Sequence, residues 1–173
     1  MRSAEGPPHK TFPVTVSREY PPAPLVAVAA VVVDGEGRIL MVERGRPPSQ
    51  GMWALPGGLL DLGEPVRAGV AREVLEETGA EIEIVDLVDL FEPIHRDAAG
   101  RIRYHYVVID FWAHYRGGDV AAADDVDDVA WVSVAKLEDL PMEEETRQVV
   151  RKAHARWRQT TGREGAAPSC RSG

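Results

Sequence analysis

The feature that most constrains the fold is an unbroken apolar run from Val26 to Val33 that is rich in β-branched valine. A run of this length and composition is typical of a β-strand buried on both faces. Such a strand has to lie inside a sheet that is covered by other layers. Extended back to Leu25, the run has nine residues, too few to cross a bilayer as a helix. The chain is therefore expected to fold around a covered sheet.

Strand and helix signals alternate along residues 25–158. The turn residues of the segment 34–37 predict a hairpin after the first strand. Further strands are predicted at residues 38–43, 52–55, 82–91, 102–114 and 129–132, and helices at residues 65–78 and 143–157. Pro65 suits the first turn of a helix, and Gly79 suits its C-terminal end. This order predicts an α/β (α+β) fold with a mixed β-sheet between helices.

The two ends of the chain differ from this middle part. Residues 1–24 hold six prolines and predict an extended N-terminal segment, in which Phe12–Val16 is a candidate edge strand. Residues 159–173 are mostly small and polar, which predicts a disordered tail. One domain, residues 25–158, is expected between them.

The composition excludes several classes of function. Lys and Arg total 20 against 28 Asp and Glu, a net charge of −8, which argues against a nucleic-acid-binding protein. The one cysteine, Cys170, allows neither an intrachain disulfide nor a cysteine-based metal site. The N-terminus lacks the apolar stretch of a signal peptide. We therefore expect a cytoplasmic protein with no membrane partner.

A cluster of glutamates marks the predicted helix 65–78. Glu73, Glu76 and Glu77 are spaced i, i+3 and i+4, which places their carboxylates on one helix face. Such like-charged pairs repel each other by roughly 0.2–0.5 kcal/mol, unless a cation lies among the oxygens. Mg²⁺ binds through carboxylates together with substrate phosphates, so this face is a candidate metal site for phosphate chemistry. The alternative is an ordinary solvated acidic face.

The segment before the helix favours the metal-site interpretation. Pro56-Gly57-Gly58 predicts a sharp turn at which backbone carbonyls approach a ligand closely. Arg72 is able to pair with Glu64 and hold this loop against the helix, because a guanidinium matches the geometry of a carboxylate.

The whole run from Gly58 to Ala80 resembles the Nudix box, Gly-x5-Glu-x7-Arg-Glu-aliphatic-x-Glu-Glu-x-Gly-aliphatic. The one departure is Ala80, which is smaller than the usual residue at a packing position. The resemblance covers roughly residues 25–158 and implies a Nudix αβα sandwich. It also implies a metal-dependent hydrolase that cleaves a nucleoside diphosphate derivative by attack of water on phosphorus.

The resemblance assigns a role to each glutamate of the box. Glu73 and Glu77 correspond to the metal-binding positions for Mg²⁺, with Mn²⁺ as an alternative, and the carbonyl of Gly58 completes the coordination. Glu76 matches the position that adds a metal contact or acts as the catalytic base. Many Nudix enzymes carry the base further along the chain, where this sequence has Asp125 in an acidic loop before a strand. A plain acidic loop is the other interpretation.

Two residues of the box are implied to be structural. Arg72 and Glu64 match the pair that orients the loop, so they are expected to have a supporting role.

Residues outside the box resemble the small bacterial ADP-ribose pyrophosphatase-like group. The residues that carry this resemblance are Arg44–Pro48, Gly51–Gly58 and His105–Phe111. They imply ADP-ribose as the substrate, cleaved to AMP and ribose 5-phosphate. Arg44 and Arg46 are expected to bind a phosphate or the terminal ribose. Both also fit as ordinary surface arginines.

Other functions stay open at this point. A nucleoside triphosphate, including oxidised forms, would be cleaved by the same chemistry. A non-catalytic Nudix domain that senses nucleotides is a further alternative, but such domains usually lose their metal glutamates, whereas this chain keeps them. The partners expected are a small-molecule nucleotide and, as an open option, a second copy in a homodimer. Trp53 is expected to pack in the core rather than stack on a base.

Overall fold

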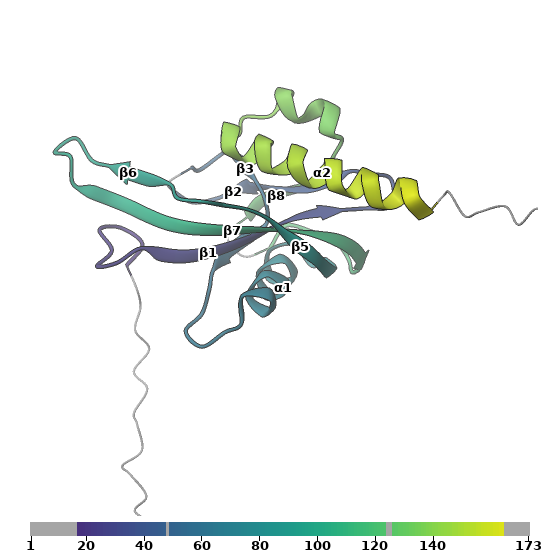
Figure 1. Cartoon of the computed structure of the whole chain (residues 1–173). Helices are drawn as coiled ribbons and strands as arrows, with labels where there is room; N and C mark the ends of the chain where they lie inside the picture. Colours follow the sequence, from purple (N-terminus) through teal and green to yellow (C-terminus); the bar gives the residue numbers. More distant parts are fainter. Residues whose placement is uncertain (1–16, 48, 124–125, 165–173) are drawn as a thin grey trace, which may run out of the picture.

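The computed structural model describes residues 17–47, 49–123 and 126–164 as one layered arrangement (Figure 1). Its elements in chain order are β1 (Leu25–Val33), β2 (Ile39–Arg44), β3 (Trp53–Ala54), β4 (Gly57–Leu59), α1 (Val66–Thr78), β5 (Glu81–Phe91), β6 (Ile94–Arg96), β7 (Ile102–Gly117), β8 (Val126–Val132), a 3₁₀ helix η1 (Val134–Asp139) and α2 (Glu144–Glu164). Helix α1 lies against one face of the sheet and α2 against the other. The expected mixed sheet between helices is confirmed.

Strand β1 lies at the centre of the sheet, whose order is β3-β2-β1-β7-β5. It pairs in parallel with β7 along its whole length, from Leu25 opposite Tyr106 to Val33 opposite His114. On its other side it pairs with β4 at its N-terminal half and with β2 at its last residue, in both cases antiparallel. This central position is why the strand needs apolar residues on both faces.

The expectation that the whole run is buried on both faces is wrong for its first residues. Burial is complete only from Val28 onward, whereas Val26 is 40% exposed. The reason is geometric, because both helices cover the C-terminal half of the strand and leave its N-terminal end open.

Two apolar cores lie on the two faces of the sheet. Alternate residues of β1, beginning with Val31, pack with the buried side of α2, and the intervening residues, such as Val32, pack with α1. The buried side of α1 follows a helical repeat, since Val70 and Val74 are fully buried and Val66 packs beside them.

The ends of α1 follow from two residues. Gly79 ends the helix in the left-handed conformation, with φ of 70°, and its backbone N–H donates to the carbonyl of Leu75. Pro65 was expected inside the first turn, but it is the extended N-cap residue. A proline suits this position as well, because it has no backbone N–H to leave unsatisfied.

The other differences from the predicted elements concern short or irregular segments. The sequence pattern did not indicate β4, β6 or η1, and β8 begins earlier than expected, at Val126. These short elements owe their geometry to pairing with longer strands, which is a tertiary effect. Between β6 and β7 the chain turns at Asp97–Gly100, where the Asp97 carboxylate accepts from backbone N–H groups. The candidate strand Phe12–Val16 lies outside the described residues.

Helix α2 is longer than expected and overlaps the predicted tail. It continues to Glu164, so residues 159–164 of the expected disordered segment are helical. The hydroxyls of Thr160 and Thr161 donate to the carbonyl of Trp157, so both side chains hydrogen-bond back onto the helix.

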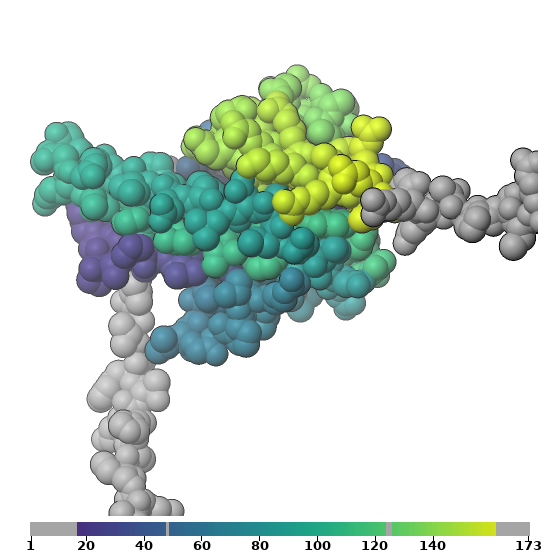
Figure 2. Space-filling model, viewed as in Figure 1, coloured from purple at the N-terminus to yellow at the C-terminus, as the bar shows by residue number. Residues whose placement is uncertain are grey.

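Strands β6 and β7 form a hairpin that projects from the packed body (Figure 2). The described part of the N-terminal segment lies against it, where the backbone N–H of Tyr20 donates to the carbonyl of Arg103. Among the described residues, no helix combines the length and the apolar character needed to cross a membrane.

Candidate functional site

A cleft of about 790 Å³ opens at the N-terminal end of β1. Its lining comes from β1, β2, β3, β4, α1, the β5–β6 connection, the first half of β7 and the start of α2. The sequence-predicted residues Gly58, Glu73, Glu76 and Glu77 all line it. The fold therefore brings the glutamates of the helix and the Pro-Gly-Gly turn into one concave site.

Strand β4 holds the turn in place beside the helix. Gly57 and Gly58 pair with Ala29 and Val28 of β1, and the Gly57 N–H donates to Oε2 of Glu77 at 2.9 Å. A Cβ at Gly58 would overlap the Glu73 carboxylate, and one at Gly57 would overlap the backbone of β1. Only glycine at both positions lets the backbone approach the acidic helix face this closely.

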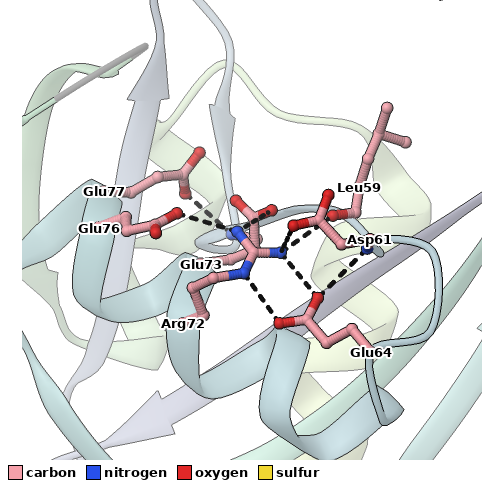
Figure 3. A network of polar contacts seen from close by, with 8 residues as sticks. Leu59, Asp61, Glu64, Arg72, Glu73, Glu76 and Glu77 are labelled. Atoms are coloured by element: carbon pink, nitrogen blue, oxygen red, sulfur yellow. Dashed lines mark hydrogen bonds and ion pairs between the residues drawn. The ribbon is translucent and has the colours of Figure 1, made fainter. Parts of the chain in front are cut away.

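Arg72 lies at the centre of a polar network on α1 (Figure 3). Its Nε and Nη2 donate to the two carboxylate oxygens of Glu64, each at 2.9 Å. Nη1 donates to Oε1 of Glu73 and Oε2 of Glu76, also at 2.9 Å. Nη2 additionally donates to the Leu59 carbonyl at 3.3 Å. The predicted pairing of Arg72 with Glu64 is thus present in the structure, together with contacts to the loop.

The network gives its carboxylates different electrostatic settings. The hydrogen bond from Arg72 lowers the pKa of Glu64 below its ordinary value. Burial raises the pKa of Glu73 despite the nearby guanidinium, because only 15% of its side chain is exposed. Glu76 is more open, with 52% of its side chain exposed. Glu73 thus lies against the protein while Glu76 faces the cleft.

The donor set suits a hard divalent cation. Carboxylate oxygens of Glu73, Glu76 and Glu77, with the backbone carbonyl of Gly58, are the ligand types that Mg²⁺ and Mn²⁺ accept. Within the part of the chain that the structure describes, no three acidic, histidine or cysteine side chains converge on one point. Arg72 Nη1 lies between Glu73 and Glu76 and neutralises both. The residues fit such a cation by chemistry and by position along one helix face.

The predicted substrate-binding arginines both line the cleft. Arg44, on β2, has a buried Nε for which the described residues supply no hydrogen-bond acceptor. Arg46 lies in the following loop. The proposed base Asp125 lies outside the described residues, although Val126 next to it lines the cleft. Trp53 is half-buried, packs against the core as expected and also lines the cleft.

Asp110 on β7 is a cleft residue that the sequence reasoning did not single out. Only 1% of the residue is exposed, and its Oδ2 has no hydrogen-bond partner among the described residues. Burial raises its pKa to about 7, and the nearby carboxylate of Asp89 adds to this effect. The available signal was a carboxylate inside the apolar run from Val107 to Trp112.

Comparisons with known proteins agree with this geometry. The model of the NUDIX domain matches residues 23–153. An ADP-ribose pyrophosphatase of Methanocaldococcus jannaschii is 32% identical over 133 residues, 75% of each chain. A MutT NUDIX hydrolase from Burkholderia pseudomallei has a similar structure, with a TM-score of 0.65, 32% identity, and coverage of 75% of this chain and 98% of that one.

A third similar protein was solved with a ligand. The NUDIX domain of NrtR from Shewanella oneidensis, in a complex with ADP ribose, superposes with a TM-score of 0.63 at 26% identity. The match covers 78% of this chain and 89% of that domain. Nudix hydrolases generally use divalent metal ions, which agrees with the oxygen-rich donor set on α1. By its family match, its fold and its acidic helix, the chain belongs to the Nudix hydrolase family.

Proposed function

We propose that this protein hydrolyses ADP-ribose to AMP and ribose 5-phosphate with Mg²⁺, or alternatively Mn²⁺, as its cofactor. The observation that carries the proposal is one continuous cleft that joins the acidic face of α1 to Arg44 and Arg46. Its volume of about 790 Å³ lies within the range of roughly 300–1,000 Å³ for small-molecule sites. The ADP-ribose pyrophosphatase relative and the ADP-ribose-bound NUDIX domain support the choice of substrate.

Glu73, Glu77 and the Gly58 carbonyl are the residues we assign to the cation. When bound, such a cation neutralises the diphosphate and lowers the pKa of the attacking water. Glu73 is well placed for this role, because its carboxylate packs against Gly58 and is fixed by Arg72.

The reaction is a hydrolysis in which the oxygen of water forms a bond to one phosphorus of the diphosphate. The bridging P–O bond breaks, and the leaving phosphate keeps that bond's electron pair. The water proton passes to a carboxylate, which we assign to Glu76 because it is the most exposed of the glutamates that contact Arg72. Asp125 is the second candidate for this base.

Arg44 and Arg46 are assigned to the other end of the substrate. A guanidinium forms two parallel hydrogen bonds with a phosphate. The buried Nε of Arg44 lowers stability as long as it has no hydrogen-bond acceptor. A phosphate or the hydroxyls of the terminal ribose would supply that acceptor. We expect the enzyme to act on the cytoplasmic nucleotide pool, as a monomer or a homodimer.

A nucleoside triphosphate, including oxidised forms, is the second candidate substrate. The similar MutT hydrolase supports this alternative. The structure gives less support to a non-catalytic sensing domain, because all three glutamates line the cleft.

Product analysis tests the proposal directly. ADP-ribose is incubated with the protein and Mg²⁺, and the products are separated by ion-exchange chromatography. Equimolar AMP and ribose 5-phosphate are expected, with none after addition of a chelator. Glu76→Gln serves as the inactive control. The absence of both products from the wild-type protein, at millimolar Mg²⁺ and neutral pH, would refute the proposed substrate.

A further inference from the structure

Asp110 lies at the point where the cleft closes into the core. Residues 106, 108, 110 and 112 of β7 alternate onto the same face of the sheet. Tyr106 and Val108 line the cleft, whereas Trp112 is only 3% exposed and belongs to the core under α2. Asp110 is therefore the innermost cleft residue on this strand.

The position of Asp110 relative to the acidic helix follows from strand pairing. Asp110 lies opposite Ala29 of β1, and Ala29 lies opposite Gly57 of β4, whose N–H binds Glu77. Two strand spacings separate Asp110 from Gly57, or roughly 10 Å. This is comparable to the separation between a diphosphate and the far edge of its own nucleobase. The side chains of Ala27 and Ala29 on the intervening strand are small and leave that path open.

The inner end of the cleft has an apolar lining around this one carboxyl group. Val108 of β7, Phe91 of β5 and Val149 of α2 all contribute to it. An apolar lining of this kind favours a flat aromatic ring. A polar group within such a lining fixes the orientation of the bound ligand. The charged parts of a nucleotide, in contrast, suit the arginines and the metal-binding face.

Building on the proposed function, we propose that Asp110 is a specificity-determining residue that recognises the adenine edge of the substrate. Its uncharged carboxyl group donates its O–H to a ring nitrogen and accepts from the neighbouring exocyclic amine. The fold itself gains nothing from this carboxyl group, because a buried carboxyl oxygen without a hydrogen-bond partner lowers stability.

The surroundings of Asp110 favour the uncharged form that this pairing needs. Asp89 on β5 lies directly opposite and pairs with Lys152 of α2, so the lysine is engaged by the other carboxylate. On β1 the neighbour is Ala29, which carries no charge. Burial and Asp89 both raise the pKa of Asp110, while Lys152 lowers it less. An ionised Asp110 would instead suit a base edge with two adjacent donors, as in guanine.

The test compares ADP-ribose with its 6-deamino analogue, in which a hydrogen replaces the exocyclic amine of the base, so that the accepting oxygen of Asp110 loses its partner. The variants are Asp110→Asn, whose amide keeps one donor and one acceptor, and Asp110→Leu, which keeps neither. Asp86→Asn, an exposed carboxylate change on β5 outside the cleft, is the matched control. Steady-state kinetics gives kcat and KM, and titration calorimetry gives Kd for both ligands without turnover, with Ca²⁺ in place of Mg²⁺.

The wild-type protein and Asp86→Asn are expected to prefer ADP-ribose by at least about tenfold in kcat/KM, mainly through KM. Asp110→Asn should keep most of this preference, whereas Asp110→Leu should reduce it to within about twofold, through a rise in KM for ADP-ribose. An equal preference in all four proteins, or a wild-type preference for the 6-deamino ligand, overturns the inference.

The calorimetric arm separates this inference from the proposed function. If ADP-ribose is not hydrolysed but binds more tightly than the 6-deamino ligand, and only Asp110→Leu removes the difference, the proposed activity fails and the role of Asp110 stands. If ADP-ribose is hydrolysed with no base preference, the activity stands and the role of Asp110 fails. Should Asp110→Leu not fold, the wild-type preference and the Asp110→Asn variant still decide between these outcomes.

Discussion

Arg72 donates two parallel hydrogen bonds to Glu64, from Nε to Oε1 and from Nη2 to Oε2, each 2.9 Å long. The same guanidinium also donates to the carbonyl of Leu59 at the end of β4 and to two carboxylates of its own helix. Because a planar fork makes all these contacts at once, Arg72 couples the position of the loop to that of the helix. A point charge of the same sign cannot do so.

Replacement of Arg72 should therefore harm both stability and catalysis. We expect Arg72→Ala to lower the free energy of unfolding by about 1–3 kcal/mol, because it leaves partly buried carboxylates without a partner. Arg72→Lys should recover only part of the stability and of kcat. Urea denaturation and steady-state kinetics measure the two effects. Arg116→Ala, which removes an exposed ion pair with Glu83, is the control and should cost less than about 1 kcal/mol. Full activity of the lysine variant would contradict the bidentate argument.

Glu77→Gln tests the assignment of the metal. The amide keeps an oxygen that can accept from the Gly57 N–H, so the turn should stay in place while the charge is lost. We expect kcat at saturating Mg²⁺ to fall by at least about 10²-fold, a scale typical of losing a key electrostatic group. Circular dichroism should be unchanged. Glu83→Gln on β5, outside the cleft, should behave like the wild-type protein, and near-normal turnover of Glu77→Gln would refute the assignment.

The close approach of the loop to the helix predicts an effect of a single methyl group. In Gly58→Ala the added carbon would overlap the Glu73 carboxylate, so the carboxylate or the loop has to move. Moving a positioned group by about 1 Å can lower the rate on the order of 10²-fold. We expect kcat/KM of this variant to fall by a similar factor. The control is Gly35→Ala, where the added carbon would meet nothing within 4 Å. Equal activity of the two variants would show that the contact does not matter.

The stability of the protein should depend on the ionisation of Asp110. Its pKa is about 7 in the folded protein and 3.8 in the ordinary state, so the folded form holds its proton across that window while the unfolded form releases it. The contribution of Asp110 to the free energy of unfolding is therefore largest below about pH 4. It declines between about pH 4 and pH 7, by at most roughly 1.4 kcal/mol per pH unit. Carboxylates with a lowered pKa, such as Glu64, act in the opposite direction at lower pH.

Asp110→Asn isolates this contribution from the others. The difference in the free energy of unfolding between the variant and the wild-type protein should increase from pH 4 to pH 7 and then level off. Urea titrations at half-unit pH intervals measure it, with Asp86→Asn as the control. A difference that does not change with pH would show that Asp110 ionises normally.

The sequence was informative where one helix or strand carries the signal by itself. Glu73, Glu76 and Glu77 could be placed on one face because a helical repeat relates them directly. The partner of Arg72 was also predictable, since the fork geometry of arginine suits one carboxylate. The carboxylate of Asp110 stands out within an apolar run, but its place in the cleft could not be predicted, because it depends on how β1, β5 and α2 surround it. Pairing between distant strands sets those contacts, and no periodicity along β7 encodes them.

The last prediction concerns the choice of substrate. We expect kcat/KM for ADP-ribose to exceed that for any nucleoside triphosphate, ordinary or oxidised. A cleft with the acidic helix face and Arg44 and Arg46 can contact groups on both sides of a central diphosphate. A triphosphate has only one nucleoside arm, and its additional charge meets a protein of net charge −8. Losing the terminal-ribose contacts should weaken binding of the transition state as well as of the substrate.

The measurement is a comparison of kcat/KM at equal free Mg²⁺ for ADP-ribose and a panel of triphosphates. Paired Arg44→Ala and Arg46→Ala variants add a structural readout. If these arginines bind the second arm, their loss should reduce the efficiency for ADP-ribose by about tenfold or more and narrow its advantage over triphosphates. A tenfold preference of the wild-type protein for any triphosphate would overturn the substrate claim. It would leave the Nudix chemistry intact, because the glutamates of α1 and the turn at Gly58 act on the phosphate groups that both kinds of substrate share.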